Sequence, residues 1–222
     1  MSGRRPFLAR VREALGSARP EAPRLEREGL AQVLAPLGQD HTSLRHAFAE
    51  NAVALRAGFH VVPDEAAAAS LIRTLVVVDG QARVATHRGH LTDRIVATLG
   101  LEPLVTDGGY DVEALATCDV AITGCLALVA QTGSVLVDAR HCGGRALTVL
   151  APHHVVVAEA AQLVAGLPQA FEVLRAAHSD DVPAFASFIT GPSRTGDIER
   201  ILVLGAHGPR VLDIVLIDAE RV

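Results

Sequence analysis

The chain has 222 residues and a formal net charge of −5, and half of its residues are apolar, which is enough to bury one sizeable hydrophobic core. The negative charge disfavours non-specific binding to nucleic acid or to anionic membranes. All 20 basic residues are arginine, which excludes a Schiff-base lysine and the lysine of a Walker A loop.

Residues 1–58 differ in composition from the rest of the chain and predict an N-terminal helical arm. Phe7, Val11 and Leu15 recur at helical spacing, and a proline-containing linker follows them. A longer helix is predicted over 42–57, because it begins at a hydroxyl cap residue and ends at a glycine. We expect this arm to pack against the main domain or against a second copy of the chain in a homodimer.

Short apolar runs alternate with helical segments over residues 59–222. The predicted strands are 59–62, 74–78, 82–86, 103–105, 119–122, 134–137, 154–158, 185–189, 201–204 and 211–217. The predicted helices are 64–72, 91–99, 111–116, 126–131 and 159–176. Such alternation favours parallel pairing through helical crossovers, and fully apolar strands suit a sheet covered on both faces. The pattern predicts one α/β domain, a three-layer α/β/α sandwich with a mostly parallel sheet, whose last two strands form an antiparallel hairpin.

Cysteine content and apolar run lengths bear on cofactors and localisation. Cys118, Cys125 and Cys142 are separated by 7 and 17 residues, without a CxxC pair, so they cannot form a ferredoxin-type cluster site or a zinc ribbon. No apolar stretch has the length of a signal peptide or a membrane span. We therefore expect a cytoplasmic protein without a membrane span.

Polar and small residues follow the predicted strand 119–122 and precede the next strand. Ligands of open α/β sheets bind beyond the carboxyl ends of strands, where glycine lets backbone amides approach. A tight turn closed by hydroxyl side chains is the structural alternative. The candidate ligand-binding residues in this segment are Thr123, Gly124, Gln131, Thr132, Gly133 and Ser134.

A second polar segment follows the predicted strand 185–189. Gly191, Ser193, Arg194 and Thr195 combine free amides, hydroxyl caps and a guanidinium, which suits a phosphate or carboxylate ligand. The alternative is a capped turn in which the arginine pairs with a neighbouring carboxylate. Because the carboxyl ends of neighbouring parallel strands open on one edge, we expect the two segments to face each other across a ligand.

Histidines supply the candidate acid–base groups. His207 lies in the loop of the predicted hairpin, where small neighbours leave its ring accessible as an acid or base, and Asp197 is a candidate catalytic carboxylate. A purely structural histidine is the alternative. No two of the histidine and cysteine positions considered have a spacing that places them on one helical face, so no metal site is expected. The other histidine and cysteine positions considered were His141, Cys142, His153 and His154.

Three strings together carry a family resemblance: AITGCLALVAQTGSVLV, LAPHHVVV and ITGPSRTGDIERILVLGAHGPRVLDIVLI. From about residue 60 onward the chain resembles the LUD domain family (formerly DUF162), and within it the lactate utilization protein C group. The resemblance implies a fold similar to the NagB/RpiA/CoA-transferase-like group. Members of the family often carry an acidic residue before Thr-Gly, whereas this chain has Gln131, which can only form hydrogen bonds.

The resemblance implies a role in oxidation of L-lactate to pyruvate. This chain would be the subunit without iron–sulfur clusters or another cofactor, it would bind a small anion, and its partners would be the iron–sulfur subunits. The alternative is a stand-alone enzyme acting on acyl-CoA or sugar-phosphate substrates, as fold relatives suggest.

Overall fold

The computed structural model describes residues 9–10, 12–14, 40–76, 82–178, 183–196, 202–204 and 207–219. Contacts divide the chain into two units, 1–36 and 37–222. The described residues of the first unit are helical. Helix α3 (His41–Ala54) belongs to the second unit, although the sequence pattern grouped it with the arm, because its buried face contributes Leu44, Phe48 and Ala52 to the hydrophobic core.

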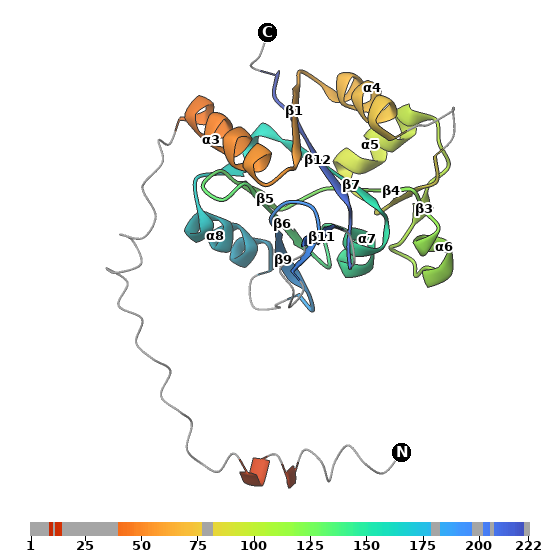
Figure 1. Ribbon diagram of the computed structural model, residues 1–222, viewed down its shortest axis with the longest axis vertical. Helices are drawn as coiled ribbons and strands as arrows, with labels where there is room; N and C mark the ends of the chain where they lie inside the picture. The colour runs from red at the N-terminus through yellow and green to blue at the C-terminus, as the bar shows by residue number, and fades with distance from the viewer. Residues whose placement is uncertain are drawn as a thin grey trace. The chain divides into compact units, whose positions relative to one another are not determined.

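A six-stranded sheet forms the centre of the second unit, and all of its neighbouring strands are parallel (Figure 1). In spatial order, the strands are β1 (Gly58–Val62), β12 (Val211–Ile217), β7 (His153–Glu159), β4 (Val120–Thr123), β2 (Val84–Thr86) and β3 (Leu104–Val105). The central strands are apolar toward both faces, as a sheet covered on both sides requires. The predicted α/β class with a mostly parallel sheet is confirmed.

One face of this sheet is covered by two helices, α4 (Glu65–Val76) and α5 (His90–Leu99) (Figure 1). Their apolar residues recur at helical spacing, as Ala68, Ile72 and Val76 do in α4, and pack against the sheet in one continuous cluster. None of the described helices is long and apolar enough to cross a bilayer.

The other face is shared between helices and a second sheet. Helices α3, α6 (Val112–Ala116) and α7 (Gly144–Leu150) pack there beside a four-stranded sheet that has helix α8 (Leu167–His178) on its far side. The second sheet has the order β8 (Leu163–Val164), β5 (Ala127–Val129), β6 (Ser134–Asp138) and β9 (Ala186–Ile189). A 3-10 turn (Ala160–Gln162) precedes β8, and β10 (Arg194–Gly196) pairs with β11 (Leu202–Leu204) in a separate ribbon.

Four sequence predictions are corrected by these elements. The described part of the predicted strand 74–78 continues helix α4, and the predicted helix 126–131 contains strand β5. The predicted helix 159–176 begins only at Leu167, after the 3-10 turn and β8. The expected hairpin is also wrong: β11 pairs antiparallel with β10, while β12 lies parallel between β1 and β7.

Candidate functional site

A cavity lies at the carboxyl edge of the six-stranded sheet, where the strand order reverses. From β2 the chain continues to β3 on one side, whereas β4 lies on the other side of β2 and leads on to β7 and β12. Ligands of open α/β sheets bind in the crevice at such a reversal. The cavity has a volume of about 180 Å³, and its lining residues are His87, Gly89, His90, Leu91, Thr92, Gly124, Cys125, His141, Val157, Glu159 and Gln162.

His87 joins the ends of β2 and β4 and is held in one neutral form. The Gly124 amide donates to His87 Nε2 at 3.0 Å, so this nitrogen is an acceptor. His87 Nδ1 is then the nitrogen that carries the proton, and it donates to the Arg88 carbonyl oxygen at 2.9 Å. Burial lowers the pKa of His87. His87 is therefore an uncharged positioning residue that fixes the floor of the cavity.

The first turn of α5 and the 3-10 turn form the walls of the cavity. Gly89 caps α5 and has no side chain to accept hydrogen bonds from the first-turn amides, which favours an anion at this end. On the opposite side, Gln162 Nε2 donates to the Cys125 carbonyl oxygen and Gln162 Oε1 accepts from the Glu159 amide. Burial raises the pKa of the Cys125 thiol well above its usual value, so this residue is not a thiolate nucleophile at neutral pH.

His141 is the half-exposed histidine of the cavity, and a buried carboxylate orients its ring. Asp138 Oδ2 lies 2.8 Å from His141 Nδ1 and 2.5 Å from Nε2 of His178. Burial pushes the pKa of Asp138 up, yet the hydrogen bonds from the two histidines hold it below its usual value. A carboxylate on Nδ1 fixes the tautomer of an imidazole and leaves Nε2 for other partners.

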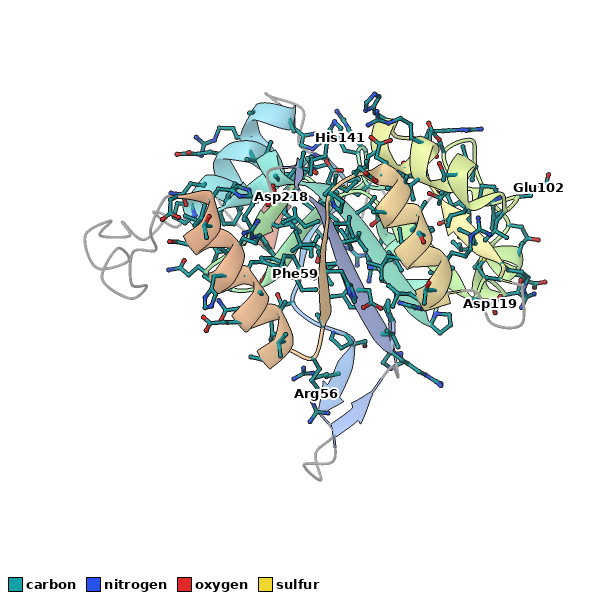
Figure 2. The ribbon with its side chains drawn as sticks, turned by 90° about the horizontal axis from the view of Figure 1, so that it is seen from above. Arg56, Phe59, Glu102, Asp119, His141 and Asp218 are labelled. Atoms are coloured by element: carbon teal, nitrogen blue, oxygen red, sulfur yellow. The ribbon has the colours of Figure 1, made fainter. Side chains whose placement is uncertain are left out.

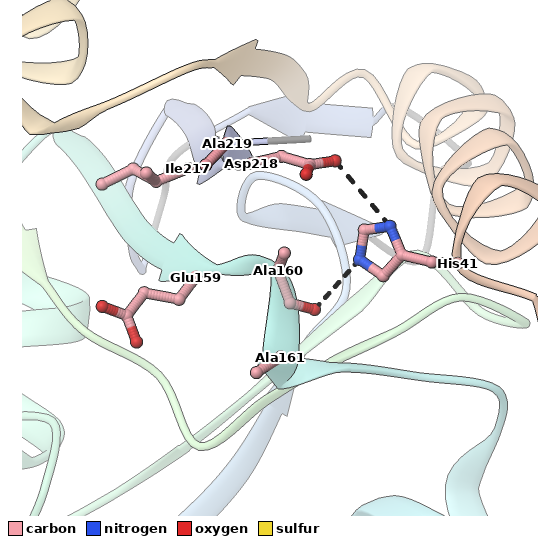
Figure 3. Close-up of a pocket in the computed structure, with 7 residues that line it drawn as sticks. All are labelled: His41, Glu159, Ala160, Ala161, Ile217, Asp218 and Ala219. Atoms are coloured by element: carbon pink, nitrogen blue, oxygen red, sulfur yellow. Dashed lines mark hydrogen bonds and ion pairs between the residues drawn. The ribbon is translucent and has the colours of Figure 1, made fainter. Parts of the chain in front are cut away.

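A larger hollow of about 480 Å³ adjoins this cavity and shares Glu159 with it. Its polar side chains are already paired: Asp218 lies 3.7 Å from His41 Nδ1 and 2.5 Å from the Arg45 guanidinium. His41 Nε2 also contacts the Ala160 carbonyl oxygen at 3.2 Å (Figure 3). These contacts tie α3 to the ends of β7 and β12, which indicates a structural junction.

The structure separates the two predicted residues at the carboxyl end of β4, Thr123 and Gly124. Gly124 lines the cavity, but its amide already donates to His87. A side-chain carbon added at Gly124 would lie 3.8 Å from His87 Nε2, an ordinary contact distance. Thr123 is fully buried, with its hydroxyl 2.8 Å from Nε2 of the buried His154. Of this pair, only Gly124 lies where a ligand can enter.

The predicted residues 131–134 form the turn between β5 and β6 and lie against α3. Asn51 of this helix donates to the carbonyl oxygens of Ala130 at 2.8 Å and of Gln131 at 3.2 Å. Ser134 Oγ lies 2.9 Å from Thr190 Oγ1, and Thr132 is half-buried beside them. The turn therefore docks α3, and none of its residues lines the carboxyl-edge cavity.

The second predicted segment lies at the amino edge of the six-stranded sheet. Arg194 donates to the carbonyl oxygen of Leu55, just beyond the last turn of α3, and the Ser193 amide donates to the Pro209 carbonyl oxygen, two residues before β12. Figure 2 shows His141 and Asp218 at one end of the molecule and Arg56 beside the β10–β11 ribbon at the other.

The expected convergence of the two segments is therefore wrong for Thr123 and Gly124, whereas Ser134 does meet the second segment at Thr190, beside Gly191. Strand β9 belongs to the second sheet and runs antiparallel to β6, so its carboxyl end does not open on the edge that β4 reaches. Gly191 packs against Leu55, and the backbone of Thr195 lies in β10. His207 is exposed near the amino end of β12, and Asp197 lies outside the described residues.

A glycine substitution tests the docking role of the 131–134 turn. Gly133 has a φ of +63°, and a side-chain carbon there would lie 2.9 Å from the Ala52 nitrogen. We expect Gly133→Ala to lower the free energy of unfolding by about 2–4 kcal/mol, because left-handed strain adds to a backbone clash. Gly100→Ala is the matched control: its φ is +67° with nothing within 4 Å, so it should cost only about 1 kcal/mol. Equal losses in urea unfolding would contradict the contact with α3.

Sequence reasoning did not select His87 or Asp138, and it gave His141 no partner. A signal was present for His87, which lies between a predicted strand and a glycine that opens a predicted helix, the arrangement typical of a strand-to-helix ligand site. Asp138 and His141 are three residues apart, but they meet through a turn, which a search for helical faces does not test. His178 joins them only through tertiary packing of α8.

Known proteins match this chain over part of its length. It is 30% identical over 121 residues to lactate utilization protein C of Deinococcus radiodurans, covering 54% of this chain and 56% of that protein. It is 33% identical over 116 residues to lactate utilization protein C of Halalkalibacterium halodurans, covering 51% and 50%. The chain thus spans about half the length of the curated relatives it matches.

A solved structure and a family profile extend the likeness. The crystal structure of a DUF162 family protein from Deinococcus radiodurans matches with a TM-score of 0.62 at 21% identity, covering 82% of this chain and 100% of that chain. At this identity the match supports the fold. The profile of the LUD domain matches residues 45–217, which include most of α3 and every strand of the six-stranded sheet. The chain therefore belongs to the LUD domain family.

Proposed function

We propose that this chain serves in lactate utilization by binding a small carboxylate anion, L-lactate or pyruvate, in the carboxyl-edge cavity. The observation that carries the proposal is the position of the cavity: it lies at the reversal of the strand order, with the first turn of α5 and a carboxylate-oriented histidine on its walls. The names of the relatives, lactate utilization protein C, support lactate as the substrate class.

The size of the cavity also favours a small ligand. Its volume of about 180 Å³ lies below the roughly 300–1,000 Å³ of sites that enclose drug-sized molecules. A three-carbon acid fits such a space, whereas coenzyme A would extend far outside it. This comparison favours the lactate proposal over the alternative of a stand-alone enzyme acting on acyl-CoA.

The proposal assigns electron transfer to partner subunits that carry iron–sulfur clusters. A four-thiolate cluster needs four cysteines, and this chain has three, each buried as a free thiol. Burial raises the pKa of Cys142 to about 12, which opposes a thiolate ligand at neutral pH. The chain would then hold the organic acid while its partners take up the electrons.

A charge substitution at the mouth of the cavity tests this function. His90 is exposed at the start of α5 and lines the cavity. His90→Glu adds a negative charge that suits a helix N-terminus but repels an anionic ligand. We expect it to weaken L-lactate or pyruvate binding, measured by titration calorimetry, about tenfold or more. In a strain lacking the gene, we expect the wild-type chain to restore growth on L-lactate and His90→Glu not to do so.

Ala97→Glu is the matched control, because it adds the same charge to an exposed position of α5 that does not line the cavity. It should bind the acid and restore growth like the wild-type chain. Normal growth of the deletion strain on lactate would contradict the role in lactate utilization. Unchanged acid binding by a folded His90→Glu variant would contradict the placement of the ligand.

A further inference from the structure

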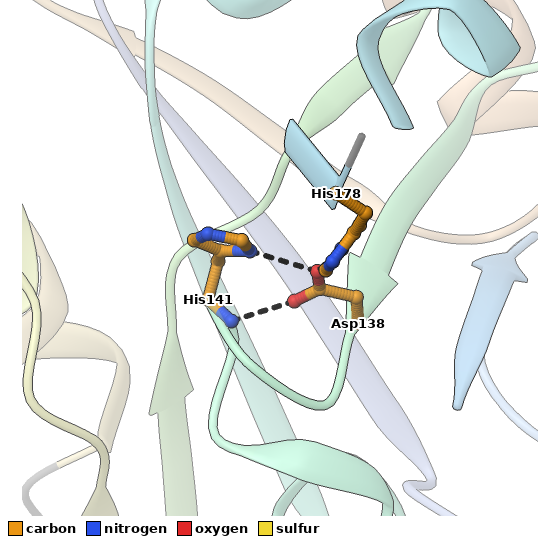
Figure 4. Close-up of side chains that lie close together, drawn as sticks. All are labelled: Asp138, His141 and His178. Atoms are coloured by element: carbon orange, nitrogen blue, oxygen red, sulfur yellow. Dashed lines mark hydrogen bonds and ion pairs between the residues drawn. The ribbon is translucent and has the colours of Figure 1, made fainter. Parts of the chain in front are cut away.

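Two imidazoles, His141 from the turn after β6 and His178 from α8, converge on one carboxylate oxygen of Asp138 behind the cavity (Figure 4). Asp138 ends β6, His141 lies in the turn that follows, and His178 ends α8. One nitrogen of each histidine lies close to Asp138 Oδ2, at 2.8 Å for His141 Nδ1 and 2.5 Å for His178 Nε2. The three ligand atoms all lie within 4.8 Å of one another.

The backbone fixes the orientation of this carboxylate. Asp138 Oδ1 accepts the amides of His141 at 2.6 Å and of Arg140 at 3.2 Å. The turn therefore occupies one oxygen and leaves Oδ2 to face both imidazoles. Outer hydrogen bonds of this kind orient the ligands in metal sites.

A second carboxylate–imidazole cluster in the same chain has a different geometry. Asp213 Oδ1 lies 2.8 Å from His60 Nε2, and Asp213 Oδ2 lies 2.7 Å from His153 Nε2. Each oxygen of Asp213 thus pairs with its own histidine in a separate hydrogen bond. Of these two clusters, the Asp138 cluster alone directs both nitrogens toward a single oxygen, and among the described residues it is the place where three such ligand atoms surround one point.

Burial divides the Asp138 cluster into an inner and an outer side. The Asp138 side chain is fully buried and that of His178 is 3% exposed, whereas His141 is 46% exposed and lines the cavity. An ion held by these atoms would have protein ligands on the inner side and a free coordination position toward the cavity. Three protein ligands with one open position are typical of zinc sites that bind water or substrate.

We propose that Asp138 Oδ2, His141 Nδ1 and His178 Nε2 bind a divalent first-row transition metal, and zinc, which two imidazoles and one carboxylate hold in catalytic sites, is the ion used to test it. The ion takes the place of the N–H protons between the imidazoles and the carboxylate. The spacing argument from helical faces predicts no metal site, because it does not consider residues that a turn and a distant helix bring together. This inference does not depend on which organic acid the cavity binds.

The test uses the full chain after treatment with a chelator, titrated with zinc chloride in a calorimeter and with cobalt(II) in a spectrophotometer. We expect about one equivalent of either metal to bind, with visible cobalt bands and a higher melting temperature in zinc. His141→Gln leaves the buried pair in place, so it should fold. It should abolish the cobalt bands and weaken zinc binding more than about 100-fold. A loss of that size exceeds the effect of removing a residue that only hydrogen-bonds to a metal ligand.

His153→Gln is the matched control, because it removes an imidazole from the Asp213 cluster, which faces the amino edge of the sheet. It should bind both metals as the wild-type chain does. Absence of stoichiometric binding by the folded wild-type chain would overturn the proposal. Binding that survives His141→Gln would also overturn it, since it would come from other histidines of the chain. Lactate binding without metal binding would reject this site and leave the proposed function intact.

Discussion

Replacing Phe48 by alanine should lower the free energy of unfolding by about 3–5 kcal/mol. Phe48 is fully buried on the inner face of α3, and its ring centroid lies 5.0 Å from that of Phe59 in β1. The substitution removes the largest buried side chain of the helix and leaves a cavity between the helix and both sheets. Since domains are stable by only about 5–15 kcal/mol, this loss is a large share of the total.

Urea unfolding followed by circular dichroism measures this loss. Val53→Ala is the matched control on the same helix: the side chain is 67% exposed, so its effect should stay within about 0.5 kcal/mol. A cost below about 1 kcal/mol for Phe48→Ala would show that α3 is a detachable arm.

Acid should destabilise the protein already between pH 6.5 and 4.5, and His154 should account for much of the loss. Burial among apolar strand residues lowers the pKa of His154 from 6.5 to about 3. Its Nε2 faces the Thr123 hydroxyl, and among the described residues its Nδ1 has no hydrogen-bond partner. A charged ring would therefore bury an unsatisfied N–H as well as a charge.

The sign follows from proton binding. Below pH 6.5 His154 is protonated in the unfolded chain but not in the folded chain. The free energy of unfolding therefore falls as the pH falls, until the pH reaches the folded-state pKa of His154 near 3. The free energy of unfolding then falls by up to about 1.4 kcal/mol per pH unit. Between pH 6.5 and 4.5 this amounts to a loss of roughly 2–3 kcal/mol.

Comparison with His154→Gln isolates this contribution. Glutamine keeps a polar group for Thr123 and cannot be protonated, so the variant should lose less stability over the same pH range. His46→Gln removes an exposed histidine of α3 and should follow the wild-type profile. Parallel profiles for the wild-type chain and His154→Gln would refute the assignment.

Sequence patterns predicted the parallel sheet because its strands are apolar on both faces. The run around Val155 and the strand 211–217 have this character, and both lie in the centre of the sheet. The hairpin prediction failed because it relied on the short loop that follows β11. The strand after that loop is buried on both faces, which suits the central position between β1 and β7. At 126–131 the apolar run is equally compatible with helix and strand, and only the partners β6 and β8 decide.

The candidate site could be predicted from the sequence only where neighbouring residues in the chain determine the position of a residue. The position of Gly124 follows from the end of a strand, and the structure places it in the cavity. The placement of Arg194 depended on which sheet receives β9, and no local pattern contains that information. The meeting of Asp138 with His178 likewise depends on the docking of α8 against the second sheet.

The position of β12 has a consequence for synthesis on the ribosome. β1 is made early, yet among the described strands it pairs only with β12, which follows every other one in the chain. Until residue 217 has left the exit tunnel, β1 has no neighbour and the adjoining edge of β7 is open. The nascent chain therefore holds a finished half-sheet with an exposed apolar edge, the kind of intermediate that chaperones protect. Closure of the sheet therefore waits for β12, which joins β1 to β7 in one step.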